Sequence, residues 1–235
     1  MGGISLVQRT EYVNYEKVDE KTRESMDRLF KAPKKNFWVK KRAFDIVASL
    51  LALIVLSPFL LIIYILIFID DPKASPVFRQ KRIGRHGKEF TMYKFRTMVA
   101  NAEQIRGELA DKNEMDGPVF KIKEDPRITK IGKFLRKTGI DEILQLVNVL
   151  KGDMSLVGPR PPLPEEVSEY DDYQKLRLVV TPGLTCIWQT TKERNDVSFE
   201  EWVNMDIDYI EHRTMLLDIK MIFKTVAVMF GRDGR

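Results

Sequence analysis

The stretch "VASLLALIVLSPFLLIIYILIFIDD" at residues 47–71 decides the fold, because it holds most of an apolar run without any charged side chain. The run extends from Ile46 to Ile69, and as a straight helix it would be about 36 Å long. The hydrocarbon core of a bilayer is about 30 Å thick, so length alone predicts a membrane-spanning helix. A buried helix of a soluble core is the alternative. The run begins well inside the chain and lacks a small-residue cleavage site, which argues against a secretory signal.

Two features of the run argue against a simple span. Pro58 lacks an N–H and clashes with the carbonyl of Ile54, which predicts a break or kink, and the Ser57 hydroxyl can take up a freed backbone group. Each half would then reach only about 17 Å. Lysine and arginine flank the run on both sides, and positive charge marks the cytoplasmic side. A re-entrant helix, which dips into the bilayer and returns, satisfies both flanks; a kinked spanning helix is the alternative.

Composition restricts the classes of partner and metal site. Of the 235 residues, 44% are hydrophobic and 31% are charged, so a folded soluble part must accompany the apolar run. The net charge of +5 favours anionic partners such as lipid headgroups, nucleotides or nucleic acid. The single cysteine, Cys186, excludes an intramolecular disulfide, and two histidines argue against a zinc centre. Any metal should therefore be a hard ion bound by oxygen.

The charge pattern divides the chain into a polar N-terminal extension at 1–39, a membrane segment at 40–72 and a cytoplasmic domain at 73–235. Residues 16–31 have the pattern of a helix with a thin apolar stripe, and we expect a solvated or surface-lying segment there. The expected fold class is α+β, mostly helical, with the membrane helix preceding a small membrane-associated domain.

Residues 87–98, "GKEFTMYKFRTM", alternate between apolar and polar side chains and predict a β-strand. In such a strand, Lys94 and Arg96 share one face. Two neighbouring cations on a strand usually lie on a solvent-exposed edge of a sheet. Beside a membrane and among other cations, they can instead hold a phosphate.

Residues 138–153, "TGIDEILQLVNVLKGD", predict a short helix that Thr138 caps, with Asp141 at the third helical position. The segment 158–166, "GPRPPLPEE", is incompatible with a helix or a central strand because its prolines remove donors. It predicts a rigid loop that fixes Arg160.

Asp141 and Glu142 are adjacent carboxylates at the N-terminus of this predicted helix. Acidic residues in a first turn complement the helix dipole, and most do nothing else. The same dipole favours a bound phosphate, and Arg136 stands just before the turn while Arg160 follows the helix. Paired carboxylates suit Mg²⁺, which would offset the charge of a diphosphate substrate.

Two helices close the chain, and the first begins at Ser198, where Glu201 completes a capping box. Asp206 lies in line with the apolar stripe of that helix, and Asp218 lies among apolar neighbours in the second, at 215–230. A carboxylate in such a position most often pairs with a buried arginine or lysine. A metal-binding or catalytic role is the alternative.

Four motifs, in this order, resemble those of the bacterial sugar transferases, the monotopic polyprenyl-phosphate phosphoglycosyltransferases. They are the Ser-Pro pair of the apolar run, "YKFRTM" at 93–98, "RKTGIDEILQLVNVLKGDMSLVGPRP" at 136–161 and "TPGLTCIWQ" at 181–189. The resemblance covers residues 40–230 and leaves out the first 39 residues.

The resemblance implies an enzyme that moves a sugar-1-phosphate from a UDP-sugar to undecaprenyl phosphate and releases UMP. This is the first membrane step in making exopolysaccharide, capsule, O-antigen or glycoprotein glycans. The implied location is the cytoplasmic face of the bacterial inner membrane, and the implied cofactor is Mg²⁺ or Mn²⁺. The expected partners are both substrates and membrane lipids, then a second copy in a homodimer and downstream glycosyltransferases, but no nucleic acid.

The resemblance also assigns roles to residues. Asp141 would be the nucleophile, would carry a covalent phosphosugar intermediate and would bind the metal together with Glu142. Ser57 and Pro58 match the family's break, which favours the re-entrant form. The remaining residues implied by the resemblance would be Lys94, Arg136 and Arg160 for substrate phosphates, Arg194 for the nucleotide, and Asp218 as structural or catalytic support. The residue pattern adds Arg96, on the strand face of Lys94, as a further phosphate contact, and Asp206, on the apolar stripe of its helix, as further support.

The sequence departs from the family pattern at three places. Cys186 stands where the family commonly has glycine, Leu144 replaces a frequent proline, and "TTKERND" at 190–196 is looser than the usual stretch around Arg194. None of these departures touches Asp141 or Glu142.

Two other functions are open from the residues alone. A membrane-anchored basic module would explain the net charge, although the acidic pair and the proline-fixed turns form a poor footprint for a nucleic-acid duplex. A lipid-phosphate hydrolase would use Asp141 with water as the final acceptor. UMP release that depends on added polyprenyl phosphate distinguishes the three functions.

Overall fold

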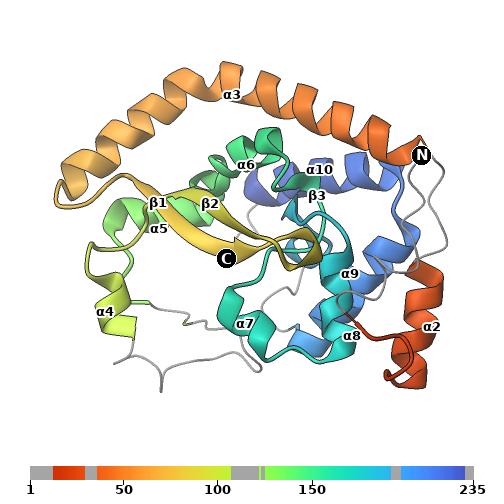
Figure 1. Ribbon diagram of the computed structural model, residues 1–235. Coiled ribbons are helices and arrows are strands. Elements are labelled where there is room, and N and C mark those ends of the chain that lie inside the picture. Colours follow the sequence, from red (N-terminus) through yellow and green to blue (C-terminus); the bar gives the residue numbers. More distant parts are fainter. Residues whose placement is uncertain (1–12, 30–35, 107–121, 123–124, 192–196, 231–235) are drawn as a thin grey trace.

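The computed structural model describes residues 13–29, 36–106, 122, 125–191 and 197–230. This part of the chain is mostly helical and has two small two-stranded sheets, β1–β2 and β3–β4, in agreement with the predicted α+β class. Figure 1 shows the long helix α3 arching over the other elements, which gather beneath it.

Helix α3 (Phe37–Asp70) continues through Pro58 without interruption. In a regular helix the carbonyl of Ile54 accepts a hydrogen bond from the N–H of residue 58, which proline lacks. The Ser57 hydroxyl donates to this carbonyl instead, at 2.8 Å. The predicted use of Ser57 is therefore confirmed. The predicted kink is a bend within one helix, visible in Figure 1, and not a break between two helices. By length and composition, α3 is able to cross a membrane.

One face of α3 packs against the rest of the protein along both halves of the helix. Lys41, Asp45 and Ser49 are buried in the first half, and Ile63 and Ile67 are buried in the second. The opposite face exposes large apolar side chains along most of the apolar run. An exposed apolar surface of this length suits contact with lipid.

An antiparallel hairpin lies beneath α3, and its elements are β1 (Val77–Ile83), the 3-10 helix η1 (Arg85–Gly87) and β2 (Glu89–Phe95). The strand predicted at 87–98 is confirmed in its central part. Phe90 and Met92 are buried on one face of β2, as the alternation requires. Because β2 ends at Phe95, the alternation does not extend to Arg96.

Short helices follow the hairpin in the chain, namely α4 (Ala102–Arg106), α5 (Lys130–Thr138), η3 (Ile140–Glu142), α6 (Gln145–Lys151), α7 (Pro164–Ser168), α8 (Asp172–Lys175), η4 (Leu176–Val179) and η5 (Trp188–Thr190). The prediction that 158–166 is entirely a loop is wrong at its end, where α7 begins at Pro164. Proline is tolerated as the first helical residue, because the N–H there has no partner within the helix.

Strands β3 (Ser155–Val157) and β4 (Gly183–Thr185) pair in parallel, and glycines let their ends approach closely. A Cβ added to Gly183 would lie 2.0 Å from the Gly158 nitrogen. The Gly183 N–H donates to the Pro159 carbonyl at 2.8 Å, and the Gly158 N–H donates to the Thr185 carbonyl at 3.0 Å. This main-chain contact holds the segment that carries Arg160.

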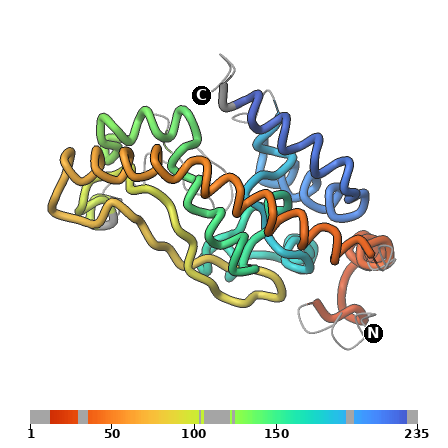
Figure 2. Tube along the Cα trace, turned by 90° about the horizontal axis from the view of Figure 1, so that it is seen from above, coloured from red at the N-terminus to blue at the C-terminus, as the bar shows by residue number. Residues whose placement is uncertain are grey.

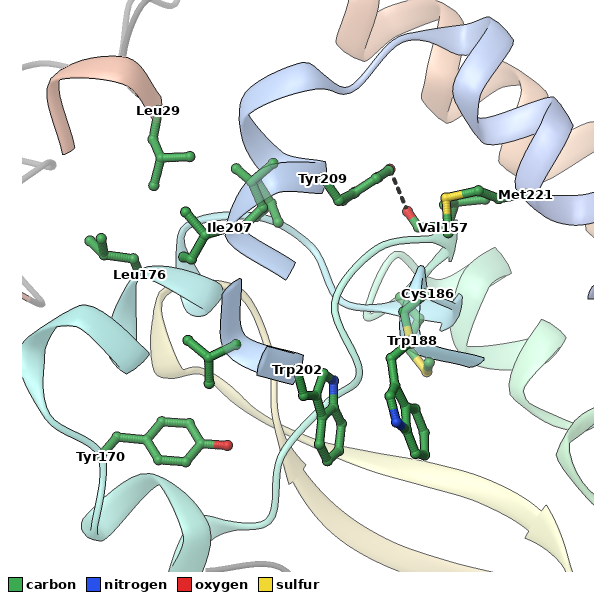
Figure 3. Close-up of a cluster of buried hydrophobic side chains, with 14 of the residues drawn as sticks. Leu29, Val157, Tyr170, Leu176, Cys186, Trp188, Trp202, Ile207, Tyr209 and Met221 are labelled. Carbon is green, nitrogen blue, oxygen red and sulfur yellow. Dashed lines mark hydrogen bonds between the residues drawn. The ribbon is translucent and has the colours of Figure 1, made fainter. Parts of the chain in front are cut away.

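Helices α9 (Phe199–His212) and α10 (Met215–Phe230) complete the fold, and α9 begins with the predicted capping box of Ser198 and Glu201. Figure 3 shows the core beside α9, where Trp188 stacks on Trp202 with ring centroids 4.6 Å apart. Cys186 lies in the same core with 2% of its surface exposed, so the departure from the family glycine fills space in the interior.

Helix α2 (Glu20–Leu29) also belongs to this body, since Val18, Met26 and Leu29 are buried in the same core cluster. Its neighbours are α8 and α9, and the Arg28 Nε atom lies 2.5 Å from the Glu211 carboxylate. The expectation of a solvated or surface-lying segment is therefore wrong for the described residues 13–29. The thin apolar stripe of α2 is sufficient to attach this helix to the core, because α8 and α9 cover it.

Candidate active site

Asp141 and Glu142 lie in a single 3-10 turn, η3, between two helices. The predicted continuous helix at 138–153 is wrong: Thr138 is the last residue of α5, and Gly139 ends that helix in the left-handed conformation with φ 69°. The Thr138 hydroxyl donates to carbonyls of its own helix and caps nothing downstream. Asp141 is therefore placed by a turn and not by a helix N-terminus, and only 8% of its surface is exposed.

The neighbouring strand β2 brings Lys94 to this turn. The Lys94 Nζ atom lies 2.7 Å from Glu142 Oε1, and the two side chains are 21% and 27% exposed. Such a half-buried pair is screened less than a surface ion pair. The contact joins two of the residues that the sequence singled out, although they are 48 positions apart.

Asn148 fixes the distance between the strand and the turn, and the sequence analysis missed it. Its amide donates to the Thr91 carbonyl at 2.7 Å and accepts the Tyr93 N–H at 3.1 Å, so it satisfies the free edge of β2 as a paired strand would. Asn148 is completely buried in α6, six residues after Glu142. Its signal in the sequence is a polar amide on the apolar side of a short helix.

Arg160 lies on the glycine-fixed loop that follows β3. Its guanidinium lies 5.4 Å from the centre of the Trp202 ring, a cation–π contact that orients the side chain. The predicted rigid placement of Arg160 by this loop agrees with the main-chain contacts of Gly158 and Gly183.

Arg82 contacts the loop of Arg160 and is a second residue that the sequence analysis missed. It is 5% exposed, and its Nη1 atom donates to the Pro161 carbonyl at 3.0 Å. Burial, followed by the positive charge of Arg160, lowers the pKa of Arg82 to about 10, while Glu166 and Glu142 oppose the shift. Arg82 thus connects the Arg160 loop electrostatically with the turn that carries Glu142.

The other two predicted phosphate contacts lie elsewhere around the turn. Arg136, in the last turn of α5, donates from Nε to the Thr97 hydroxyl at 2.9 Å. Arg96 donates to the Asp71 carbonyl and lies 3.7 Å from the Asp71 carboxylate, so it fastens the end of α3. The structure therefore gives Arg96 a structural contact and does not group it with Lys94.

The acidic residues of the last two helices pair with buried cations, as the structural alternative predicted. Asp206 lies 2.6 Å from Arg177 Nη2, and Asp218 lies 2.5 Å from Lys41 Nζ. Both carboxylates are 1% exposed. Arg194 lies outside the described residues.

The carboxylates of Asp141 and Glu142 fit a magnesium ion by their chemistry. Mg²⁺ usually takes one or two protein carboxylates and completes its shell with water and substrate phosphates. Among the residues that the structure describes, no group of three or more histidine, cysteine, aspartate or glutamate side chains gathers. The turn therefore supplies two candidate ligands, and phosphates would have to supply others.

Comparisons with known proteins show which family the chain resembles. A family model for bacterial sugar transferases matches residues 36–232. Galactosyl transferase CpsE of Streptococcus agalactiae is 43% identical over 196 residues, which is 83% of this chain. Undecaprenyl-phosphate galactose phosphotransferase of Salmonella typhimurium is 44% identical over 201 residues, again 83% of the chain. Exopolysaccharide production protein ExoY of Sinorhizobium fredii is 38% identical over 201 residues.

The matched region spans 43% of CpsE and 41% of the Salmonella protein, so the chain is similar to less than half of each. It spans 88% of ExoY. The family match includes the bent helix α3, the turn of Asp141 and Glu142, the Arg160 loop and α10. The resemblance predicted from the motifs is thereby confirmed, and the chain belongs to the bacterial sugar transferase family.

Proposed function

We propose that this protein transfers a sugar-1-phosphate from a UDP-sugar to undecaprenyl phosphate, giving undecaprenyl-diphosphate-sugar and UMP. The names of its relatives support the acceptor and the reaction class, since one is an undecaprenyl-phosphate galactose phosphotransferase. The name of another relates to exopolysaccharide production. The product would therefore start the synthesis of an exopolysaccharide or capsule.

The observation that carries the proposal is the acidic turn that Lys94 contacts, together with the fixed cation of Arg160 on a separate loop. Lys94 lies against Glu142 from β2, and the glycine-fixed loop holds Arg160. Phosphoryl transfer needs this combination, because a carboxylate nucleophile meets a phosphate only when cations offset the charge of both. The apolar face of α3 would bring the same body to the membrane that contains the acceptor.

In the proposed reaction, the Asp141 carboxylate attacks the sugar-bearing phosphorus of the donor. The bond from this phosphorus to the bridging oxygen breaks, and UMP leaves with that oxygen. A sugar-phosphate is then bound to Asp141 as an acyl phosphate. An oxygen of undecaprenyl phosphate attacks the same phosphorus, the bond to Asp141 breaks, and the carboxylate is regenerated. The two substrates thus use one nucleophile in turn, which predicts ping-pong kinetics.

Other side chains would prepare Asp141 for this attack. Lys94 would hold Glu142 in place and reduce the negative charge of the turn, and Arg160 would bind phosphate oxygens. Asp141 and Glu142 would hold Mg²⁺. When bound, the ion would neutralise charge on the diphosphate and orient it.

We further propose that α3 is re-entrant and that the protein lies at the cytoplasmic face of the inner membrane. Lys41 in the first half of α3 and Ile67 in the second half contact one folded body. A spanning helix would carry its two ends to opposite sides of a core about 30 Å thick, and these contacts would be separated. Figure 2 shows α3 crossing above that body from end to end.

Measurement of UMP release by the purified chain in nanodiscs, with a panel of UDP-sugars, tests the proposed function. Continuous release should require both a UDP-sugar and undecaprenyl phosphate, and excess EDTA should stop it. UDP-galactose and UDP-N-acetylgalactosamine come first in the panel, because relatives carry these sugars in their names. Sustained release without any lipid acceptor would indicate a hydrolase, and full turnover in EDTA by metal-free protein would remove Mg²⁺ from the account.

A further inference from the structure

The guanidinium of Arg82 is buried near the end of β1, and its Nε–H group is unpaired. Its Nη1 atom donates to the Pro161 carbonyl at 3.0 Å, and its Nη2 atom donates to Gln80 Oε1 at 2.8 Å. The Nε–H group is buried and has no hydrogen-bond partner. A buried donor on a charged group is costly when it is unsatisfied, so this site is incomplete within the described chain.

The charge of Arg82 is also incompletely balanced. Arg160 is close enough to lower its pKa, and with a pKa of about 10 Arg82 is still a cation at neutral pH. Among the described residues, no carboxylate lies within ion-pair distance of Arg82 or Arg160. Glu166, the acidic residue whose charge raises the pKa of Arg82 most, already accepts the Leu163 N–H at 2.8 Å. Two neighbouring guanidiniums without a paired anion are a typical phosphate-binding arrangement.

Hydrogen bonds join the loop of Arg160 to the strand of Arg82, so the two segments have a fixed position relative to each other. The Ile83 N–H donates to the Pro162 carbonyl at 2.9 Å, next to the contact of Arg82 with Pro161. Arg160 is oriented from its other side by Trp202. The pair is therefore fixed before any ligand binds.

We propose that Arg82 and Arg160 together form the subsite that binds the diphosphate of the nucleotide donor, with Arg82 contributing its unused donor to a phosphate oxygen. This inference rests on the proposed function. The charge of Glu142 also acts on Arg82, so Arg82 lies within electrostatic range of the acidic turn.

The position of the pair assigns it to the water-soluble donor and not to the lipid acceptor. The segment with Pro161 and Pro162 leads directly into α7, and α7 contacts β1. In Figure 1, α7 and α3 lie on opposite sides of the hairpin. Lys94 and Glu142 lie next to α6, which packs against α3. The lipid phosphate would thus approach from the α3 side, and the donor from the α7 side.

Direct binding of UDP to Arg82→Gln tests the proposal, with the full chain in nanodiscs and calorimetry as the readout. The affinity for UDP should fall about tenfold or more, because a charge-assisted contact is lost. The KM for undecaprenyl phosphate should stay within about twofold. Arg79→Gln is the matched control, because Arg79 is an exposed arginine on the same strand, and its UDP affinity should equal that of wild type.

A purely structural role of Arg82 would give a different pattern. Loss of the Pro161 contact would then lower the melting temperature and weaken the binding of both substrates. Unchanged UDP affinity in Arg82→Gln would overturn the proposal, and so would a selective rise in the KM for the lipid phosphate. If Arg82→Gln does not fold, Arg82→Lys is decisive. Lysine keeps the positive charge but lacks the planar guanidinium with its several donors, so Arg82→Lys should bind UDP several-fold more weakly than wild type. Equal affinity would overturn the proposal. If wild type releases no UMP from any UDP-sugar, the proposed function itself fails.

Discussion

Two sets of charged side chains in this protein differ in how completely the chain pairs them. In the first set, Asp218 accepts from Lys41 at 2.5 Å and from the Tyr209 hydroxyl at 2.8 Å, and Asp206 accepts from Arg177 through two nitrogen atoms. In the second set, around Glu142, the Arg82 Nε atom has no partner, and the guanidinium of Arg160 rests on a ring.

This difference distinguishes the charges that hold the helices together from the charges that lie around the candidate active site. The fully paired charges have their partners within the chain, and they connect α3 with α10 and α9 with the segment of Arg177. Charges that are only partly paired remain available to a charged ligand. Trp202 lies between the two sets, since the Arg177 guanidinium is 5.1 Å and the Arg160 guanidinium 5.4 Å from its ring centre. Trp202, which the Arg177 side of the fold holds in place, thereby orients Arg160.

Asp141→Asn should have the largest effect on activity and almost none on the fold. The amide has the same shape but is not a nucleophile, so transfer should fall by at least about 1,000-fold. Melting temperature and membrane association should match wild type. A near wild-type rate of UMP release in a steady-state assay of this variant would contradict the assignment of Asp141.

Asp218→Ala should have the opposite profile. It leaves the Lys41 ammonium buried without a partner, and loss of one member of a buried pair costs roughly 3–5 kcal/mol of unfolding free energy. Chemical denaturation measures this cost. The double variant Lys41→Met with Asp218→Leu removes both charges and should recover most of the stability. A single variant as stable as wild type would show that this pair is no scaffold.

Asn148→Ala should affect both properties moderately. The loss of the two contacts with β2 should lower stability by about 1–3 kcal/mol and reduce kcat about tenfold, because Lys94 is no longer held against Glu142. Asn204→Ala is the matched control, since Asn204 is exposed and accepts one hydrogen bond from Tyr173. Equal losses in the two variants would refute a positioning role for Asn148.

Pro58→Leu combined with Ser57→Ala should have the smallest effect, a partial change in topology. Without the bend, α3 is a straight helix long enough to span, so a fraction of molecules should expose one terminus outside the cell. Accessibility of terminal tags in intact cells measures that fraction. Wild-type topology and turnover in the double variant would show that the bend does not direct the re-entry, and the packed contacts of Lys41 and Ile67 would then be sufficient.

Features encoded by local sequence were predictable. The capping box at Ser198, the strand around Lys94 and the hydrogen bond of Ser57 to the preceding turn all depend on residues at most four positions apart. The adjacent carboxylates at 141 and 142 were visible for the same reason. The division of 138–153 into two elements was missed, because its apolar spacing suits one helix and only the left-handed Gly139 interrupts it.

The roles of Arg82 and Asn148 depend on partners far away in the sequence. Arg82 contacts Pro161 across 79 positions, and Asn148 contacts Thr91 across 57. No periodic pattern predicts such pairs, since tertiary packing alone brings them together. Arg96 shows the reverse case: its alternation with Lys94 predicted a shared face, but the strand ends one residue earlier and Asp71 captures the side chain.

Intact-protein mass spectrometry tests the central claim most directly, namely that the incompletely paired site performs chemistry through Asp141. Wild type incubated with UDP-sugar and Mg²⁺, without lipid, should gain the mass of one sugar-phosphate and release one equivalent of UMP. Added undecaprenyl phosphate should remove the adduct. Asp141→Asn should show no adduct under the same conditions. An adduct of equal abundance on Asp141→Asn, or efficient turnover by wild type with no adduct at any time, would contradict the account.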